Sequence, residues 1–240
     1  SWPPIPRAGG HCAPEGYKTM SDKVKRLEKL RGKFVVFEGL KGCGKSTIAE
    51  FVAKIAKGEG VDVFLTEEPT GGKHGATLRE ILKGKAHMPS PIELQQIFIN
   101  DRMEHTSEIR KALLKHQLVI CNRYDASTFV HGSIASGHDI FFFITTQESM
   151  FRKKDIIYRR PDIVLWLDAE PSIIIERLNA RTRGFDTVTT TPEILEAVRR
   201  GYEELMKAKP YPILRIDTKD PIPDVVYACW EKILQQFQLQ

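Results

Sequence analysis

A glycine-rich segment between residues 39 and 46 carries the most specific chemical signal in the sequence. It reads GLKGCGKS, which places glycines, a lysine and a serine at the spacing G-x-x-x-x-G-K-[ST]. Glycines let the backbone curl so that successive N–H groups surround a phosphate, while the lysine reaches the β- and γ-phosphates and the serine hydroxyl reaches Mg²⁺. The alternative is a glycine-rich strand-to-helix turn that matches by accident. The pattern predicts a nucleoside triphosphate site formed by Gly39, Leu40, Lys41, Gly42, Cys43, Gly44, Lys45, Ser46 and Thr47.

Short apolar segments and longer helical patterns alternate from residue 34 onward. This alternation is typical of βαβ units, whose right-handed crossovers place helices on both faces of a parallel sheet. The sequence therefore predicts a three-layer α/β/α fold with one five-stranded sheet, and ligands at the carboxyl ends of its strands. The predicted strands cover 34–37, 61–65, 118–121, 163–167 and 213–216. The predicted helices cover 45–57, 75–83, 91–115, 124–136, 171–180, 192–208 and a last segment from 221.

Composition excludes several classes of protein. The 240 residues are 41% hydrophobic, which is enough for a globular core. The longest apolar runs, 140–144 and 163–167, are far shorter than the roughly 20 residues that span a bilayer, so no membrane segment is expected. A net charge of +5 is spread along the chain, so nucleic-acid binding is not favoured. The four cysteines are widely separated, which favours a reducing, intracellular (cytoplasmic) setting over a disulfide framework or a zinc site.

The first thirty residues are predicted to be an extension, and residues 31–240 to be the catalytic domain. Residues 1–16 hold four prolines and three glycines, a composition typical of a linker. Residues 17–33 are rich in basic side chains around a short apolar stripe, which predicts a surface helix and leaves a partner contact as the alternative. Because the first residue is Ser1, the segment is interpreted as a tag remnant, a processed product or a piece of a longer polypeptide.

Four further stretches, together with the glycine-rich loop, resemble the thymidylate kinase family of nucleoside monophosphate kinases. The resemblance covers roughly residues 33–237. Its motifs are FVVFEGLKGCGKST at 34–47, TEEPTGGKHGATLREIL at 66–82, FINDR at 98–102, NRYDAST at 122–128 and RTRG at 181–184, followed by a tyrosine at 202. Each stretch is weak alone, whereas their order and spacing together are specific. The resemblance implies a P-loop NTPase fold with a short arginine-bearing lid, ATP-dependent conversion of dTMP to dTDP with Mg²⁺, and a homodimer.

The resemblance also implies a cationic catalytic set. Phosphoryl transfer between polyanions needs an aligned acceptor and neutralised charge, which arginines and Mg²⁺ supply. Arg123 would clamp the acceptor phosphate, with a surface ion pair as its alternative role. Arg181 and Arg183 would close over ATP, although a solvated lid residue is the alternative for each singly. Together with Lys45, these three arginines form the predicted catalytic set.

The predicted acceptor site follows from the same resemblance. Phe98 and Arg102 lie four residues apart on one helix face, where Phe98 would stack on thymine and Arg102 would bond a base carbonyl. His131 lies where a family aromatic crowds the sugar 2′ position, and a packed or exposed ring is its alternative. The remaining predicted acceptor residues are Glu68, Pro69, Arg79, Arg123, Ser127 and Thr128.

The predicted metal ligands are Ser46, Asn122 and Asp168. Asp168 ends the fourth apolar run, where it would contact Mg²⁺ through water or cap the helix that begins at Pro171. Thr218 and Lys219 lie where the family contacts adenine, and backbone groups would suffice there. Cys43 is either a reactive thiol at a helix start or a small filler residue.

Three substitutions depart from the family pattern. Lys41 replaces a loop carboxylate that contacts the sugar 3′-hydroxyl, Asn122 replaces the Asp of D-R-Y, and Glu67 replaces the Arg of T-R-E-P. The lid also lacks the D-R-x-E continuation. These changes leave two alternatives open: a kinase for another pyrimidine or modified deoxynucleoside monophosphate, and a catalytically weakened protein that binds ATP and a partner.

Overall fold

The computed structural model describes residue 25, residues 27–180 and residues 191–238. Leu30 is 1% exposed and packs in the main hydrophobic core, although the predicted extension includes it. Among the helices of these residues, none combines the length and the hydropathy that a bilayer-spanning segment requires.

The predicted five-stranded parallel sheet is confirmed, with the strand order β2-β3-β1-β4-β5. All four pairings are parallel, and β1 is the central strand. Every residue of β1, β4 and most of β3 is buried, which fits their continuous apolar sequences. The strands are β1 Phe34–Gly39, β2 Val63–Glu67, β3 Leu118–Asn122, β4 Ile163–Asp168 and β5 Ile213–Asp217.

The second strand begins two residues later than predicted. Val61 donates its backbone N–H to the carbonyl of Ala56, so it belongs to the turn that ends the preceding helix. The strand then extends to Glu67, which pairs in register with Asn122. The shift brings Glu67 to the carboxyl edge of the sheet.

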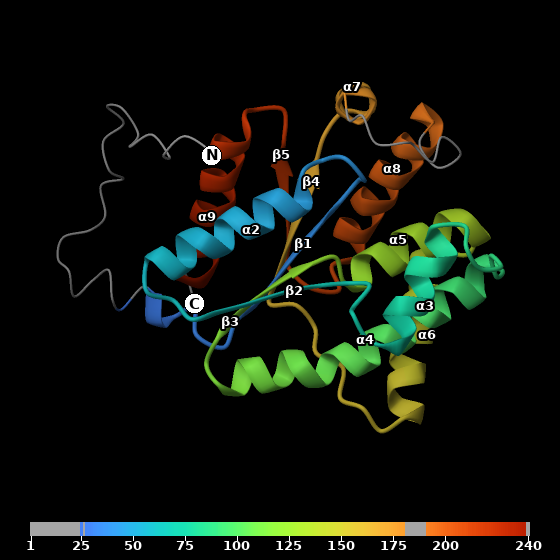
Figure 1. Cartoon of the computed structure of the whole chain (residues 1–240), viewed down its shortest axis with the longest axis horizontal. Helices are drawn as coiled ribbons and strands as arrows, with labels where there is room; N and C mark the ends of the chain where they lie inside the picture. The colour runs from blue at the N-terminus through green and yellow to red at the C-terminus, as the bar shows by residue number, and fades with distance from the viewer. Residues whose placement is uncertain (1–24, 26, 181–190, 239–240) are drawn as a thin grey trace.

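All seven predicted helices are present. Figure 1 shows α2 and α9 side by side over one face of the sheet, with α4, α5 and α8 on the opposite side. The helices are α2 Lys45–Gly58, α3 Lys73–Leu82, α4 Pro91–Leu114, α5 Asp125–Ser136, α7 Pro171–Asn179, α8 Pro192–Ala208 and α9 Ile222–Gln238.

The sequence analysis missed α6, Ile140–Lys153. Its first turn contains three consecutive phenylalanines, which favour a strand, but Asp139 caps the helix by accepting a hydrogen bond from the backbone N–H of Phe142 at 2.8 Å. The buried positions Ile140, Phe143, Gln147 and Phe151 recur every three or four residues. That spacing is the helical signal that the apolar run concealed.

Alternating side chains of β1 face the two helical layers. Val35 and Phe37 belong to the core that includes α2 and α9, whereas Phe34 and Val36 pack in a second cluster with Ile109 of α4. The next residue on the α4 side is Glu38, because strand side chains alternate with a period of two. A carboxylate therefore lies under the carboxyl edge of the sheet, fully buried.

Candidate active site

The loop after β1 has the backbone geometry that phosphate binding requires. Gly39 has φ 138°, and a Cβ there would lie 2.2 Å from the carbonyl oxygen of Leu167. Gly44 begins α2 with φ 95°, and no side chain caps the helix N-terminus. The first N–H groups of α2 and its positive dipole end are therefore directed at the loop, which is the arrangement that binds phosphate.

Lys45 lies inside this loop at 6% exposure. Its ammonium donates hydrogen bonds to the carbonyl oxygens of Gly39 at 2.9 Å and Leu40 at 2.6 Å, and it lies 3.7 Å from the Cys43 sulfur. Burial and the positive charge of Arg123 lower the pKa of Lys45 to about 8. A desolvated cation satisfied only by neutral carbonyls is well placed to bind an anionic phosphate instead.

The predicted metal ligands Ser46 and Asn122 are in direct contact. The Asn122 Nδ2 donates to Ser46 Oγ at 3.0 Å and lies 3.5 Å from Glu67 Oε2. The Asn122 Oδ1 is buried and has no hydrogen-bond partner. Two neighbouring side-chain oxygens, one of them unpartnered, and a nearby carboxylate fit the oxygen donor set of a hydrated Mg²⁺.

Arg123 leaves β3 in a strained backbone conformation that directs it along the same edge. Its φ is 68°, a left-handed value uncommon for a side-chain-bearing residue, and its N–H donates to the Phe37 carbonyl at 2.9 Å. Its guanidinium Nη1 donates to Ser127 Oγ at 2.9 Å. The structure thus brings two predicted acceptor residues together at the end of β3.

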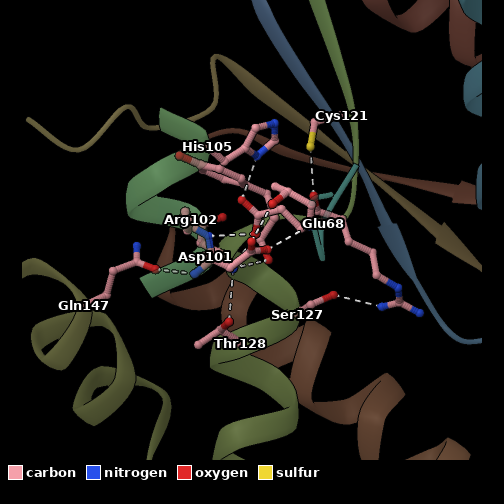
Figure 2. Close-up of polar contacts among 12 residues, drawn as sticks. Glu68, Asp101, Arg102, His105, Cys121, Ser127, Thr128 and Gln147 are labelled. Atoms are coloured by element: carbon pink, nitrogen blue, oxygen red, sulfur yellow. Dashed lines mark hydrogen bonds and ion pairs between the residues drawn. The ribbon is translucent and has the colours of Figure 1, made fainter. Parts of the chain in front are cut away.

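A buried network lies behind these residues, with Glu68, Arg102 and His105 at its centre (Figure 2). Arg102 is 1% exposed and donates twice to Glu68 Oε2, at 3.0 and 2.7 Å, while His105 Nδ1 lies 3.0 Å from Glu68 Oε1. Arg102 also donates to Gln147 Oε1, Thr128 Oγ1 and the carbonyl of Tyr124. Glu68 is predicted to bind substrate, but both of its oxygens are used inside the protein to hold Arg102 and His105.

The same network qualifies the predicted roles of Arg102 and Thr128. Thr128 is 2% exposed and accepts a bond from Arg102 at 3.1 Å. A bond from Arg102 to a base carbonyl would replace one of its present protein bonds, and it stays a prediction. Phe98, one turn earlier on α4, is half-buried, and its stacking on a base also stays a prediction.

Arg79 and Pro69 are joined within one loop. The Arg79 Nη2 donates to the Pro69 carbonyl at 2.6 Å, and its Nη1 donates to the carbonyl of Thr70. Asp101 accepts the Thr70 backbone N–H at 2.8 Å and its hydroxyl at 2.5 Å. The segment between β2 and α3 is therefore fixed against α4 by polar contacts that sequence spacing does not reveal.

His131 lies on the acceptor side of the same edge. Burial, together with the positive charges of Arg123 and Lys45, lowers the pKa of His131 to about 3. The imidazole is therefore neutral at physiological pH. Its electrostatic coupling to both cations agrees with its predicted place beside the acceptor.

Asp168 is occupied by arginines. Its carboxylate accepts bonds from Arg199 Nε at 3.1 Å and Arg215 Nη2 at 2.5 Å, and its side chain is 6% exposed. The N-cap of α7 is Glu170, without a side-chain cap bond. The predicted cap by Asp168 is therefore wrong; its carboxylate joins α8 to β5, and its contact with Mg²⁺ stays a prediction.

Two other predictions concern the segment after β5, expected to contact adenine, and the arginine-bearing lid. Thr218 follows β5 and is 2% exposed; its hydroxyl donates to the Asp168 carbonyl at 2.9 Å, and its carbonyl accepts from Arg177 Nη2 at 2.5 Å, so the contact of Thr218 and Lys219 with adenine stays a prediction. Arg181 and Arg183 lie outside the described residues, and their lid roles stay predictions.

Comparison with known proteins decides the family. The family model described as thymidylate kinase matches residues 37–228. The chain is 32% identical over 206 residues to the thymidylate kinase of Desulfovibrio desulfuricans, covering 82% of this chain and 92% of the relative. It is 32% identical over 202 residues to that of Leptospira interrogans, covering 84% and 93%. A probable thymidylate kinase of Methanococcus maripaludis is 33% identical over 184 residues, covering 74% and 79%.

The chain belongs to the thymidylate kinase family. Membership confirms the predicted resemblance and the P-loop α/β fold, and it makes the protein a nucleoside monophosphate kinase with ATP as its phosphate donor. The predicted activity, phosphorylation of dTMP to dTDP, is confirmed at the level of the family.

Two departures from the thymidylate kinase pattern are neighbours in the structure. Glu67 and Asn122 end adjacent strands and pair in register, and their side chains approach to 3.5 Å. A carboxylate is therefore present at this edge on β2, although the position on β3 carries a neutral amide. Lys41, the third departure, is exposed at the start of the phosphate loop.

The sequence analysis did not assign a role to Glu38, although the family motif contains it. Glu38 is 0% exposed and accepts four hydrogen bonds, from residues of α5, α8 and the turn after β3. A charged residue within an otherwise apolar strand, directly before the glycine loop, is the signal in the sequence that marks it.

Proposed function

We propose that the protein transfers the γ-phosphoryl group of ATP to dTMP, with Mg²⁺ as cofactor, at the carboxyl edge where β1, β2 and β3 end. A phosphate oxygen of dTMP attacks the γ-phosphorus, the bond to the β-phosphate oxygen breaks, and dTDP and ADP are formed. The observation that carries this proposal is that the phosphate loop meets the end of β3: Asn122 donates to Ser46 of the loop, and the positive charge of its neighbour Arg123 acts on Lys45.

The donor side is formed by the loop and the start of α2. Backbone N–H groups without a side-chain cap receive the phosphate oxygens, and the ammonium of Lys45 exchanges its carbonyl partners for the β- and γ-phosphates. Because Lys45 is desolvated, its attraction to the developing charge is stronger than in water. Arg181 and Arg183 would add positive charge from the lid and exclude water.

The acceptor side is centred on Arg123. Its planar guanidinium matches a phosphate bidentately and would hold the acceptor oxygen in line with the γ-phosphorus. Phe98 would stack on the base, and neutral His131 would pack near the sugar without adding charge. Glu68 and Thr128 support this side from within by fixing Arg102.

Ser46 and Asn122 would hold Mg²⁺, with Glu67 close enough to bind its water shell. The fit rests on the unpartnered Asn122 Oδ1 beside Ser46 Oγ. When bound, the ion neutralises negative charge on the β- and γ-phosphates. Asp168 is omitted from this set because two arginines bind its carboxylate.

The test is ADP production from ATP and Mg²⁺ with dTMP, dUMP, dGMP, dCMP, UMP and AMP measured side by side. The fastest turnover with dTMP supports the proposal. Arg123→Ala should lower kcat/KM for dTMP by about a hundredfold or more, as expected for loss of a charge-assisted phosphate clamp. Arg160→Ala is the matched control, because that arginine is exposed and pairs with Glu148 away from this edge.

Other outcomes would decide between the alternatives. Faster turnover with another pyrimidine monophosphate would keep the kinase and replace dTMP as the substrate. ATP binding without turnover on any acceptor would overturn the proposal in favour of a catalytically weakened protein.

We also propose that the protein acts as a homodimer in a reducing, intracellular compartment. The family resemblance supports the dimer, and light scattering of the purified chain tests it. The free, buried thiols of Cys43, Cys121 and Cys229 support the compartment. Fractionation of the source cells tests the compartment.

A further inference from the structure

The Glu38 carboxylate connects three elements around the proposed acceptor clamp. Its Oε1 accepts the backbone N–H groups of Tyr124 at 2.7 Å and Ser127 at 3.2 Å. Its Oε2 accepts the hydroxyls of Ser127 at 2.6 Å and Tyr202 at 2.9 Å. Glu38 lies in β1, Ser127 in α5 and Tyr202 in α8, so one side chain fixes the relative positions of all three elements.

The Ser127 hydroxyl has only one proton, and the contacts around it determine where that proton points. An ionised carboxylate accepts and never donates, so the hydroxyl donates to Glu38. Its lone pairs are then left for the guanidinium of Arg123, which donates to the same oxygen at 2.9 Å. In Figure 2 a dashed line joins the labelled Ser127 to a guanidinium, and this line is the bond donated by Arg123.

The carboxylate also has an electrostatic effect on this edge. Glu38 has no exposure to solvent, and its negative charge favours the charged form of Lys45. Four donors compensate the desolvation of its charge, which would otherwise cost several kcal/mol. A neutral isostere at this position would keep the volume and remove both the charge and the acceptor at Oε2.

We propose that Glu38 is a positioning residue, which orients Arg123 toward the acceptor phosphate by polarising the Ser127 hydroxyl. The inference rests on the proposed role of Arg123 as the acceptor clamp. In Glu38→Gln, the amide oxygen satisfies the two backbone N–H groups, and the amide nitrogen then faces Ser127 Oγ. The amide donates to that oxygen and takes one of its two lone pairs, and the hydroxyl proton, no longer held by a carboxylate, turns toward Arg123 and weakens the bond from the guanidinium.

The test is a double-mutant cycle with Glu38→Gln, Ser127→Ala and both together, read out as kcat/KM and equilibrium binding of dTMP. Each single variant should weaken dTMP binding by about tenfold, the typical effect of one bond to a charged group. The double variant should be no weaker than the worse single variant, because Ser127→Ala leaves no hydroxyl to invert. ATP binding at pH 6.5, where Lys45 is charged, should change by less than about twofold, since the donor contacts stay intact.

Ser133→Ala is the matched control, because it removes a hydroxyl from the same helix, α5, that donates to the His138 carbonyl and is not bonded to Glu38 or Arg123. It should leave dTMP binding within about twofold of the wild type, since well-separated effects are independent. Thermal unfolding of every variant confirms that each is folded at the assay temperature.

Three results would overturn the inference: additive effects in the double variant, equal losses for Ser133→Ala and Glu38→Gln, or unchanged dTMP binding in Glu38→Gln. If dTMP binding is unchanged in Glu38→Gln while Arg123→Ala abolishes it, only the role of Glu38 fails. If Arg123→Ala leaves dTMP binding intact, the proposed clamp itself fails.

Discussion

The surroundings of Lys45 disfavour the charged form of its ammonium. Its pKa is lowered to about 8, chiefly by burial and by Arg123, while Cys43 and Glu38 act in the opposite direction. The pH dependence of kcat/KM for ATP reports the ionisation of the free enzyme, and binding of the phosphates requires the charged ammonium of Lys45. We therefore expect kcat/KM for ATP to be constant below pH 7 and to fall above about pH 8.

Steady-state kinetics between pH 6 and 10 checks this dependence on pH. Lys45→Arg is the control, because a guanidinium stays charged over the whole range and should remove the fall at high pH even if activity is lower. An identical fall in Lys45→Arg would assign the titration to another group.

Lys41 presents a cation where the family pattern has a carboxylate. An ammonium donates hydrogen bonds but does not accept one from the sugar 3′-hydroxyl. We expect Lys41→Asp to raise kcat/KM for dTMP relative to 3′-deoxy-TMP by severalfold, the effect of one added hydrogen bond, while ATP binding changes less. Equal changes for both acceptors would show that Lys41 does not sense the 3′ position.

A functional residue can be predicted from the sequence when the residues that it acts with are close to it in the chain. The phosphate loop and Lys45 are local, so spacing alone predicts them, and Arg123 is indicated by its place after a strand. Glu38 and Glu68 bind partners that the sheet topology brings close, 86 and 34 positions away in the closest cases. Spacing holds no information on such contacts, so the bonds of Glu68 with Arg102 could not be predicted, and its contact with substrate stays a prediction.

At the scale of elements, close contact between α5 and α8 depends on a small residue. A Cβ added at Gly201 of α8 would lie 2.7 Å from Val130 Cγ1 and 3.5 Å from Ile134 Cδ1, both on α5. Gly201→Ala should therefore destabilise the protein by about 1–2 kcal/mol, because overpacking outweighs the better helix propensity of alanine.

Urea unfolding measures this difference. The matched control is Gly58→Ala in α2, where nothing lies within 4 Å of the added Cβ, so that the change should be neutral or slightly stabilising. Equal free energies of unfolding for the Gly201 and Gly58 variants would mean that α5 and α8 separate easily.

The elements themselves could be predicted wherever local signals agree. The Ser90–Glu93 capping box and Pro91 mark the start of α4, which begins at the predicted residue 91. In α6, β-favouring aromatics opposed the helical spacing of the buried positions, and the packing of Phe143 against α5 resolved the conflict. Tertiary contact overrides local propensity in such segments.

At the scale of the whole molecule, Asp125 joins segments that are distant in the sequence. It accepts hydrogen bonds from Tyr158 and, at 2.8 Å, from Tyr211, and burial raises its pKa to about 6, above the ordinary value of an aspartate. The folded protein therefore binds a proton between about pH 4 and 6 that the unfolded chain releases. Over this range the free energy of unfolding should fall as the pH rises, by about 3 kcal/mol from this group.

Comparison of Asp125→Asn with the wild type isolates this contribution. The variant should lack the decrease between pH 4 and 6, as measured by urea unfolding at several pH values. His131, whose pKa is lowered to about 3, acts in the opposite direction in both proteins, so the difference between the two curves belongs to Asp125. Parallel curves would mean that Asp125 titrates normally in the folded state.

The central position of β1 affects how the protein folds during its synthesis. Phe34 of β1 pairs with Val119 of β3, and Val35 of β1 pairs with Ile163 of β4. Both neighbouring strands therefore lie far after β1 in the sequence. During synthesis on the ribosome, the strand that carries the phosphate loop therefore emerges long before either neighbour, and such distant parallel pairings form slowly. A nascent chain should acquire affinity for nucleotide only after residue 168 has left the exit tunnel.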